Sequence, residues 1–525
     1  MKYYSRLSLS VFLTSLFLLT QNVSAEEYSC EDLINFKMDG YNISINKAAT
    51  IPEGKMSSGP FGPPAYDGVI PAYCRVDGEI DKRIGHEGKP YAIGFAIALP
   101  KVWNGRFMFQ GGGGMNGTVA DPIGAQGGGI PALARGFAVI TSDTGHKSGG
   151  GAFDVSFMAD QEAYMNFLYK AIGKVTAVGK KIVEKHYGKP ISYSYYVGCS
   201  TGGREAMIMS QRYPDYYDGI VSGAPAMRTN YSNLGIKWMQ VSLNQAAPLD
   251  ANGEPVPGGG LLEKDINLLI DTFINSCDMK DGIKDGMVFN NIGCGFDPEV
   301  LICKGEKEGE DCLTEKQVKA VKQGLAGPVT TGGMQVYSPF AIDTGLNAKV
   351  GIPGLLVMTQ SMLGPPSKET KMDIDREYIE KTDGVAAAGD TFLWTNLTTF
   401  SGHGGKLIFY HGMSDPWFSA LDTVDYYNRL IRDNGGAEKV YEWSRIFLVP
   451  GMCHCSGGEK TVDTFDMLSA ITDWVEKGIT PDSIIATGKN LPGISRPLCP
   501  YPKYPHYKGT GDSNNAEYFE CRNAD

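Results

Sequence analysis

The chain has 525 residues, 67 of them glycine, and a formal net charge of -11 at pH 7. Because this length exceeds what one hydrophobic core usually holds, we expect a main domain that carries an insertion. Acidic and basic residues form no block of like charge, which argues against a nucleic-acid partner and against a basic patch for a membrane surface. These features leave the oligomeric state open.

The N-terminus has the three-part pattern of a secretory signal peptide. A short basic start at residues 2–6 is followed by an apolar run at residues 7–19 and by small residues up to Ala25. A membrane anchor needs about 20 apolar residues, whereas this run is shorter and is interrupted by serine and threonine. We therefore expect residues 1–25 to be cleaved and the mature protein to be secreted or periplasmic. No other stretch of the sequence is long and apolar enough to span a bilayer.

The strand-like and helix-like segments alternate along much of the chain. Strands are expected at residues 91–99, 106–109, 138–141, 193–197, 219–222, 406–410 and 445–449, and helices at 164–186 and 202–212. Such alternation predicts an α/β fold, with a mostly parallel sheet and helices on both faces. Between residues 225 and 400 the alternation fails, and glycine, proline, cysteine and aspartate become frequent. We interpret residues 225–400 as a lid domain, inserted into a core made of residues 26–224 and 401–525.

A nucleophile elbow is predicted at residues 198–202, which read Gly-Cys-Ser-Thr-Gly and directly follow a strand. The G-x-S-x-G pattern forms a sharp strand-to-helix turn that exposes a serine hydroxyl above the sheet. Ser200 is therefore the candidate nucleophile.

An acyl-transfer site also needs hydrogen-bond donors for the developing oxyanion. One is expected to be the backbone N–H of Thr201, the residue after the nucleophile. The glycine-rich loop at residues 110–117 is expected to supply the other, from Gly112 or Gly113. A phosphate-binding loop is a weak alternative, because the segment lacks the lysine of a P-loop and the spacing of a dinucleotide fingerprint.

In α/β-hydrolases the serine is followed along the chain by an acidic residue and then by a histidine. Asp415 follows the strand at 406–410 and is the candidate acid, which would orient the histidine and stabilise its charged form. His454 follows the strand at 445–449 and is the candidate base. A turn residue before proline is the alternative role for Asp415. His411 is the rival base, but it precedes the candidate acid and lacks an adjoining cysteine.

Eleven cysteines in an exported chain indicate a disulfide framework. Local spacing predicts the bridges Cys277–Cys294, Cys303–Cys312 and Cys499–Cys521, and Cys30–Cys74 then forms near the N-terminus. Cys199 remains for the neighbourhood of His454, where either Cys453 or Cys455 is left over as a thiol. A zinc site is a weaker interpretation, because residues 453–455 lack a second ligand pair at a usual spacing.

A bridge from Cys199 to Cys455 would have a direct consequence for the candidate site. The first cysteine precedes Ser200 and the second follows His454. Bridged cysteines have Cα atoms roughly 5.5 Å apart, so such a disulfide would bring the candidate nucleophile and base together.

An acidic loop within the predicted lid is a candidate metal site. Its carboxylates at Asp278, Asp281 and Asp285 are spaced by three and four residues, and its glycines permit a tight turn. With the backbone carbonyls of Ile283 and Met287 they would form an oxygen shell suited to a structural Ca²⁺. The loop is not an EF-hand, because the glutamate at position twelve is absent, and a solvated acidic turn is the alternative.

Four motifs together resemble the tannase and feruloyl esterase family, which includes bacterial hydrolases of mono(2-hydroxyethyl) terephthalate. They are the elbow at 198–204, the acidic loop that begins at Cys277, residues 414–416 and residues 451–455. The resemblance covers nearly the whole mature chain. It implies an α/β-hydrolase with a Ca²⁺-bearing lid, a Cys199–Cys455 disulfide between the catalytic loops, and hydrolysis of carboxylic esters of aromatic acids. Some relatives bind a free carboxylate with a lid arginine in a Gly-Trp-Arg context, which residues 354–356 lack here.

We therefore expect a secreted serine esterase that acts on small aromatic esters of the hydroxycinnamate (feruloyl) type through an acyl-enzyme. A tannase acting on galloyl esters, a terephthalate half-ester hydrolase and a peptidase on a similar fold are alternatives among the hydrolases. Anchors for a peptide are not identifiable in the sequence. A non-catalytic Ca²⁺-dependent binding protein is a remote alternative, because all three triad residues are present.

Overall fold

A computed structural model of the protein describes residues 28–56, 66–125, 128–304, 311–349, 352–361, 367–382 and 384–524. The predicted signal peptide at residues 1–25 lies outside these ranges. Within them, no helix combines the length and the apolar character needed to cross a bilayer.

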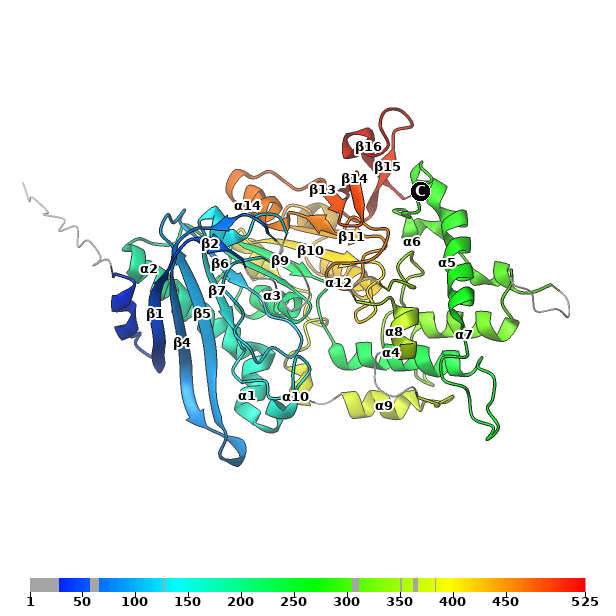
Figure 1. Ribbon diagram of the computed structural model, residues 1–525, viewed down its shortest axis with the longest axis horizontal. Coiled ribbons are helices and arrows are strands. Elements are labelled where there is room, and N and C mark those ends of the chain that lie inside the picture. Colours follow the sequence, from blue (N-terminus) through cyan, green and yellow to red (C-terminus); the bar gives the residue numbers. More distant parts are fainter. Residues whose placement is uncertain are drawn as a thin grey trace, which may run out of the picture.

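A nine-stranded sheet runs through the core of the molecule (Figure 1). In spatial order its strands are β1 (Ile43–Ile51), β4 (Tyr73–Ile84), β5 (Pro90–Pro100), β7 (Ala138–Ser142), β6 (Arg106–Gln110), β8 (Tyr193–Cys199), β9 (Gly219–Gly223), β10 (Lys406–Gly412) and β11 (Ser444–Val449). The strands from β7 to β11 in this order are parallel, whereas β1, β4, β5 and β7 pair antiparallel. Every predicted strand lies in this sheet, and the predicted α/β fold is confirmed.

Helices cover both faces of the sheet. Those of the core are α1 (Gln161–Met165), α2 (Ala171–Tyr187), α3 (Thr201–Arg212), α12 (Ala420–Asp433), α13 (Ala437–Val440) and α14 (Met467–Lys477). Successive strand side chains point to opposite faces, so Tyr196 packs with α2 and α12 while its neighbours Tyr195 and Val197 pack with α14. The predicted helix at 164–186 is interrupted by a π-helical turn at Asn166–Lys170.

The segment between β9 and β10 contains the predicted lid and is helical. Its helices are α4 (Thr229–Asn244), α5 (Glu263–Cys277), α6 (Asn291–Cys294), α7 (Glu315–Ala326), α8 (Leu355–Ser361), α9 (Ile374–Lys381), α10 (Gly384–Ala387) and α11 (Thr398–Gly402). Met239, Leu269 and Val321 are among the buried side chains of a hydrophobic core that belongs to this segment. Figure 1 shows α4 to α9 gathered on the side of the molecule away from β1 and β4.

The C-terminal residues add small antiparallel elements that the sequence did not predict. These are a sheet of β12 (Thr464–Phe465), β13 (Ile484–Gly488) and β14 (Leu491–Leu498) and a hairpin of β15 (Lys503–Tyr507) and β16 (Phe519–Asn523), while β2 (Gly54–Lys55) pairs with β3 (Val69–Ile70) near the other end of the chain. Arg496 of β14 donates a hydrogen bond of 2.5 Å to Asp285, so the small sheet is tied to the acidic loop.

Five disulfides link the described residues, and they are the same five pairs that the sequence and the family resemblance predicted. They are Cys30–Cys74, Cys199–Cys455, Cys277–Cys294, Cys303–Cys312 and Cys499–Cys521. Cys453 is a buried free thiol. Burial, together with nearby carboxylates, raises the pKa of this thiol to about 12.

Candidate active site

Ser200 lies at the turn between β8 and α3, with φ of 65° and ψ of -124°. A non-glycine residue seldom has positive φ, and such strain clusters at functional sites. The turn needs glycine on both sides, because a Cβ on Gly198 would lie 2.5 Å from the backbone of Gly202, and one on Gly202 would lie 2.7 Å from the carbonyl oxygen of Gly112. The G-x-S-x-G pattern therefore forms the predicted elbow.

Asp415 and His454 form a buried pair at the carboxyl ends of two neighbouring parallel strands. Asp415 follows β10, His454 follows β11, and His454 Nδ1 lies 2.6 Å from Asp415 Oδ2. The other carboxylate oxygen of Asp415 accepts hydrogen bonds from the backbone N–H groups of Trp417 and Phe418, at 2.9 Å and 3.0 Å. Burial alone would raise the pKa of Asp415, but the adjacent His454 and His411 hold it well below its usual range. The acid of this pair is therefore ionised at neutral pH.

His411 contacts Asp415 from a second direction and is fully buried. Its Nε2 lies 3.3 Å from Asp415 Oδ2 and 2.9 Å from the carbonyl oxygen of Phe418, and its Nδ1 lies 2.8 Å from Thr423 Oγ1. Since a carbonyl only accepts, Nε2 carries the hydrogen in this contact. His411 thus supports the carboxylate from an enclosed position, and His454 is the histidine that pairs with it most closely.

The Cys199–Cys455 disulfide joins the serine turn to the histidine loop. The two Cα atoms are 6.0 Å apart, although 256 residues separate the cysteines in the sequence. Cys455 has φ of 64°, and the N–H of Ser456 donates to the carbonyl of His454 at 2.8 Å. This three-residue turn fixes the backbone beside the histidine ring.

The two glycines predicted to supply an oxyanion donor differ in their surroundings. The N–H of Gly112 donates to the buried carboxylate of Glu205 at 3.1 Å, so it is not free to bind an oxyanion. Gly113 is exposed, and no heavy atom lies within 4 Å of the position that a Cβ would take there. Thr201 is the first residue of α3, as the elbow pattern requires. The candidate donors are therefore reduced to the amides of Thr201 and Gly113.

Two aromatic rings pack beside the candidate base. The ring centroids of Trp417 and Phe418 lie 4.9 Å and 5.4 Å from that of His454. Phe153 packs edge-on against Trp417 at 6.2 Å and is 70% exposed. Neither Phe153 nor Phe418 was predicted from the sequence. Phe418 could have been found from its position three residues after Asp415, whereas no local sequence pattern places Phe153 beside this loop.

The acidic loop places Asp278 and Asp281 in buried positions, at 2% and 1% exposure. Burial raises the pKa of both carboxyls, and with the nearby carboxylate of Asp285 it raises that of Asp281 to about 8. The oxygens of the three carboxylates accept hydrogen bonds from backbone N–H groups, including that of Met287. Among the described residues, no three His, Cys, Asp or Glu side chains are arranged to hold a metal ion. Asp278 and Asp281 are nevertheless buried carboxyls, and together with the partly buried Asp285, which pairs with Arg496, they form an oxygen donor set of the kind that a hard cation prefers.

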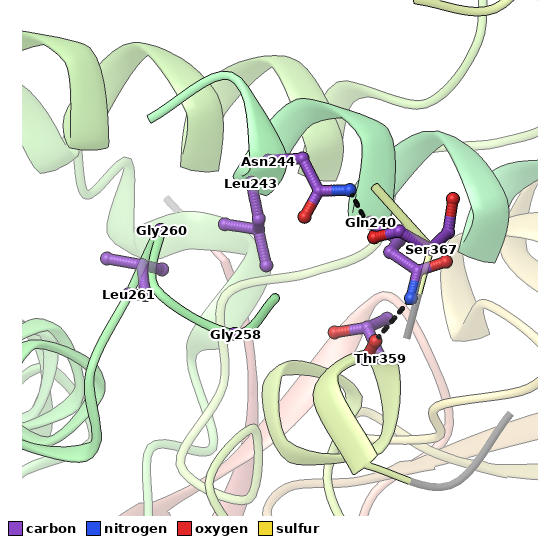
Figure 2. Close-up of a pocket in the computed structure, with 8 residues that line it drawn as sticks. All are labelled: Gln240, Leu243, Asn244, Gly258, Gly260, Leu261, Thr359 and Ser367. Atoms are coloured by element: carbon purple, nitrogen blue, oxygen red, sulfur yellow. Dashed lines mark hydrogen bonds between the residues drawn. The ribbon is translucent and has the colours of Figure 1, made fainter. Parts of the chain in front are cut away.

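A small cavity inside the lid segment is drawn in Figure 2. Asn244 Nδ2 donates to the carbonyl of Ser367 at 2.8 Å, and Gln240 Nε2 donates to that of Thr359 at 3.1 Å. Its volume of about 10 Å³ suits a single water molecule. An aromatic acid therefore does not fit there.

A parallel sheet with a strained serine after one strand and a buried Asp–His pair after two others defines a serine hydrolase of the α/β-hydrolase type. The family model described as tannase and feruloyl esterase matches residues 74–387 and 390–522. The chain therefore belongs to the tannase and feruloyl esterase family, and it is an ester hydrolase.

Individual relatives and solved structures support the same family assignment. The chain is 38% identical over 522 residues to the mono(2-hydroxyethyl) terephthalate hydrolase of Piscinibacter sakaiensis, covering 86% of this chain and 85% of that protein. The crystal structure of feruloyl esterase B from Aspergillus oryzae matches with a TM-score of 0.74 and 25% identity, over 94% of this chain and 99% of that one. Another esterase from Aspergillus oryzae, with a TM-score of 0.76, 24% identity and coverage of 94% and 99%, has the same fold.

Proposed function

We propose that this protein hydrolyses small carboxylic esters of aromatic acids, of the hydroxycinnamate type, through an acyl-enzyme on Ser200. The observation that carries the proposal is the buried Asp415–His454 pair. The loop that holds His454 is tied to the serine turn by a disulfide. The aromatic side chains beside His454 support an aromatic acid as the acyl group, because edge-to-face ring contacts favour it.

In the proposed mechanism, Ser200 Oγ attacks the ester carbonyl carbon while His454 takes the hydroxyl proton. The electron pair of the C=O bond moves onto oxygen, where it is stabilised by the N–H groups of Thr201 and Gly113. The C–O bond to the alcohol then breaks, and the alcohol leaves with the proton from His454. A water molecule, deprotonated by His454, attacks the acyl-enzyme, and the acid leaves as Ser200 recovers its proton. Asp415 stays ionised throughout and stabilises the charged histidine.

Terephthalate half-esters are a second candidate substrate class, supported by the 38% identity to the hydrolase named for one of them. Such substrates carry a free carboxylate that a protein usually binds with a cation. Some relatives have a lid arginine in a Gly-Trp-Arg context, whereas residues 354–356 of this chain include Leu355 and Leu356. These two leucines are buried in the apolar core of the lid segment and provide no cation. This observation favours uncharged aromatic esters, including feruloyl and galloyl esters, over the half-ester.

Initial rates on methyl ferulate, methyl gallate, a p-nitrophenyl ester and a terephthalate half-ester test the substrate class. The hydroxycinnamate ester should give the highest kcat/KM, and a clear preference for the half-ester would overturn that choice. An active-site phosphonate tests the mechanism, because it should add to Ser200 and to no other residue in peptide mapping. The Ser200→Ala variant is the control, and full hydrolysis by it would contradict the acyl-enzyme.

The acidic loop of the lid segment is the proposed site of a structural Ca²⁺. The side chains of Asp278, Asp281 and Asp285 and the carbonyls of Ile283 and Met287 would hold the ion, which would favour the charged forms of the buried Asp278 and Asp281. The metal would supply stability and take no part in the ester chemistry. Titration of the chelated protein with Ca²⁺ in a calorimeter tests the site, and no heat of binding would exclude it.

Export from the cytoplasm is also proposed, to the periplasm or the medium. Five disulfides support it, because such bonds persist in oxidising compartments. N-terminal sequencing of the protein recovered from its host should begin at Glu26.

A further inference from the structure

Glu205 is a buried carboxylate that the proposed chemistry does not use. It lies in α3, one turn after Thr201, and is 1% exposed. Its Oε2 accepts hydrogen bonds from the N–H of Gly112 at 3.1 Å and the Tyr196 hydroxyl at 2.7 Å, and its Oε1 accepts one from Asn116 Nδ2 at 2.7 Å. All three partners donate, so an acceptor is required at this position.

Side chains on one face of α3 form hydrogen bonds with every second residue of the glycine-rich loop. Thr201 and Glu205 are four positions apart and therefore lie on the same face of the helix. Thr201 Oγ1 donates to the carbonyl of Gly114 at 2.5 Å, while Glu205 binds Gly112 on one side of it and Asn116 on the other. The loop is thus fixed to the helix whose N-terminus carries the candidate nucleophile.

Gly113 lies between these attachment points. Its carbonyl accepts a hydrogen bond from the N–H of Asn116 at 2.9 Å, which closes a tight turn. The preceding residue, Gly112, accepts a hydrogen bond from the N–H of Gly202 at 3.1 Å, which ties the loop to the elbow. The position of the Gly113 amide is therefore set by its neighbours, and two of these neighbours are held by Glu205.

We propose that Glu205 is a positioning residue that fixes the Gly113 and Thr201 amides relative to each other as one oxyanion hole. This inference rests on the proposed acyl-transfer function. Glu205 acts through the loop and does not contact the substrate. Preorganised donors stabilise charge only where they are aimed at the oxygen that develops it. A loosened loop should therefore weaken binding of the transition state and leave binding of the ground state unchanged.

The Glu205→Ala variant separates these two effects. Its kcat should fall by about 10²–10³, the loss expected when one oxyanion donor is misplaced, while KM stays close to that of the parent. A boronic acid that forms a tetrahedral adduct on the serine should lose affinity in proportion to kcat. The amide of the same acid, which is uncharged and forms no stable tetrahedral adduct, should bind unchanged. Glu205→Gln keeps one acceptor oxygen and should recover part of the lost kcat.

Gln211→Ala is the matched control for loss of a buried polar side chain from the same helix. Gln211 is 7% exposed and donates to the carbonyls of Thr391 and Trp394, away from the glycine-rich loop. This variant should lose thermal stability while its kcat and boronate affinity stay unchanged. An equal loss of kcat in both variants would show that Glu205 is only a structural residue.

A double-mutant cycle with Asn116 tests the loop contact itself, and it remains informative if Glu205→Ala does not fold. Asn116→Ala should lower kcat with KM unchanged, and adding it to Glu205→Gln should cause less than the sum of the two single losses. Additive losses would overturn the inference, as would a folded Glu205→Ala variant with normal kcat and boronate affinity. A protein whose Ser200 reacts with phosphonate but whose Glu205 variants are normal retains the proposed function and loses only this inference.

Discussion

Cys199 and Cys455 are joined by a disulfide, and each is the direct neighbour of a residue of the proposed triad. The bond therefore crosslinks the turn that holds Ser200 to the loop that holds His454. Both of these segments contain a residue at positive φ, Ser200 itself and Cys455. A covalent link between two strained loops restrains the relative positions of the proposed nucleophile and base.

Replacing both cysteines with serine should lower stability and rate by separate mechanisms. Chain-entropy estimates for a loop of this length give about 5 kcal/mol as an upper figure for the loss of unfolding free energy. Displacing the histidine by about 1 Å should cost roughly 100-fold in kcat. Urea unfolding measures the first effect, and kinetics well below the Tm measure the second. The Cys303→Ser, Cys312→Ser variant is the control and should lose stability alone. Normal kcat in a folded Cys199→Ser, Cys455→Ser variant would refute the positioning role.

Removal of the proposed nucleophile or base should abolish turnover without unfolding the protein. Ser200→Ala and His454→Ala should each lower kcat by on the order of 10⁴ or more, and Asp415→Asn should cost about 10⁴ because the histidine loses its orientation. The exposed His403 provides the control, since His403→Ala should leave kcat unchanged. Circular dichroism should show that all variants are folded. Near-normal turnover in Asp415→Asn would assign the acid role to another residue.

The strands of the parallel sheet could be predicted from the sequence because they are buried on both faces and form short apolar runs. Strand β9, for example, is buried throughout. Strand β4 was not predicted because its burial alternates and its partly buried positions carry charged residues, such as Arg75 and Asp77. Its place in the sheet is set by pairing with β1 and β5, which no local pattern encodes.

Some of the site residues could likewise be predicted from the sequence, and others could not. Ser200, Asp415 and His454 could be chosen as candidates from the sequence because each follows a predicted strand in a motif of its own, and the structure places each of them after such a strand. The role of Gly112 could not be predicted, because its N–H donates a hydrogen bond to Glu205, which lies 93 residues later in the sequence. Contacts between distant segments decide which of two adjacent glycines stays free, and only the folded structure reveals them.

Chelation of calcium should lower the Tm, because a ligand that binds only the folded state stabilises it by mass action. The shift should be restored by Ca²⁺ in a concentration-dependent manner. Well below the lowered Tm, kcat should be unchanged, since the metal has no place in the proposed mechanism. Asp281→Asn should reduce the calcium-dependent part of the shift. Loss of turnover on chelation without a change in Tm would require a catalytic metal instead.

The thiol of Cys453 should resist alkylation in the folded protein. An unfolded cysteine ionises at about pH 8.5, whereas burial raises the pKa of Cys453 to about 12. The folded state thus disfavours the thiolate, so the stability present below about pH 8.5 is lost as pH rises from there toward 12. Relative to Cys453→Ala, the parent protein should therefore lose unfolding free energy above pH 9. Rapid iodoacetamide labelling of the folded protein at pH 8 would contradict the burial of this thiol.

Asp343 connects the lid segment to both loops of the acid–base pair. It is fully buried, and its Oδ2 accepts hydrogen bonds from Ser414 Oγ at 2.5 Å and from the N–H of Gly451 at 2.7 Å. Ser414 precedes Asp415, and Gly451 lies three residues before His454. Asp343→Asn should leave one of these donors poorly paired and destabilise the protein by about 1–3 kcal/mol. Because the acid and base loops share this acceptor, kcat should also fall, by about tenfold or more.

Asp265→Asn is the control that separates the loss of stability from the loss of kcat in Asp343→Asn. Asp265 is another buried lid carboxylate, which accepts hydrogen bonds from the N–H of Leu262 at 2.9 Å and from Gln317 Nε2 at 3.0 Å, within the lid segment alone. Its variant should lose a similar unfolding free energy in urea and keep the parent kcat. If Asp343→Asn also kept the parent kcat, Asp343 would hold the lid segment in place without aligning the acid and the base.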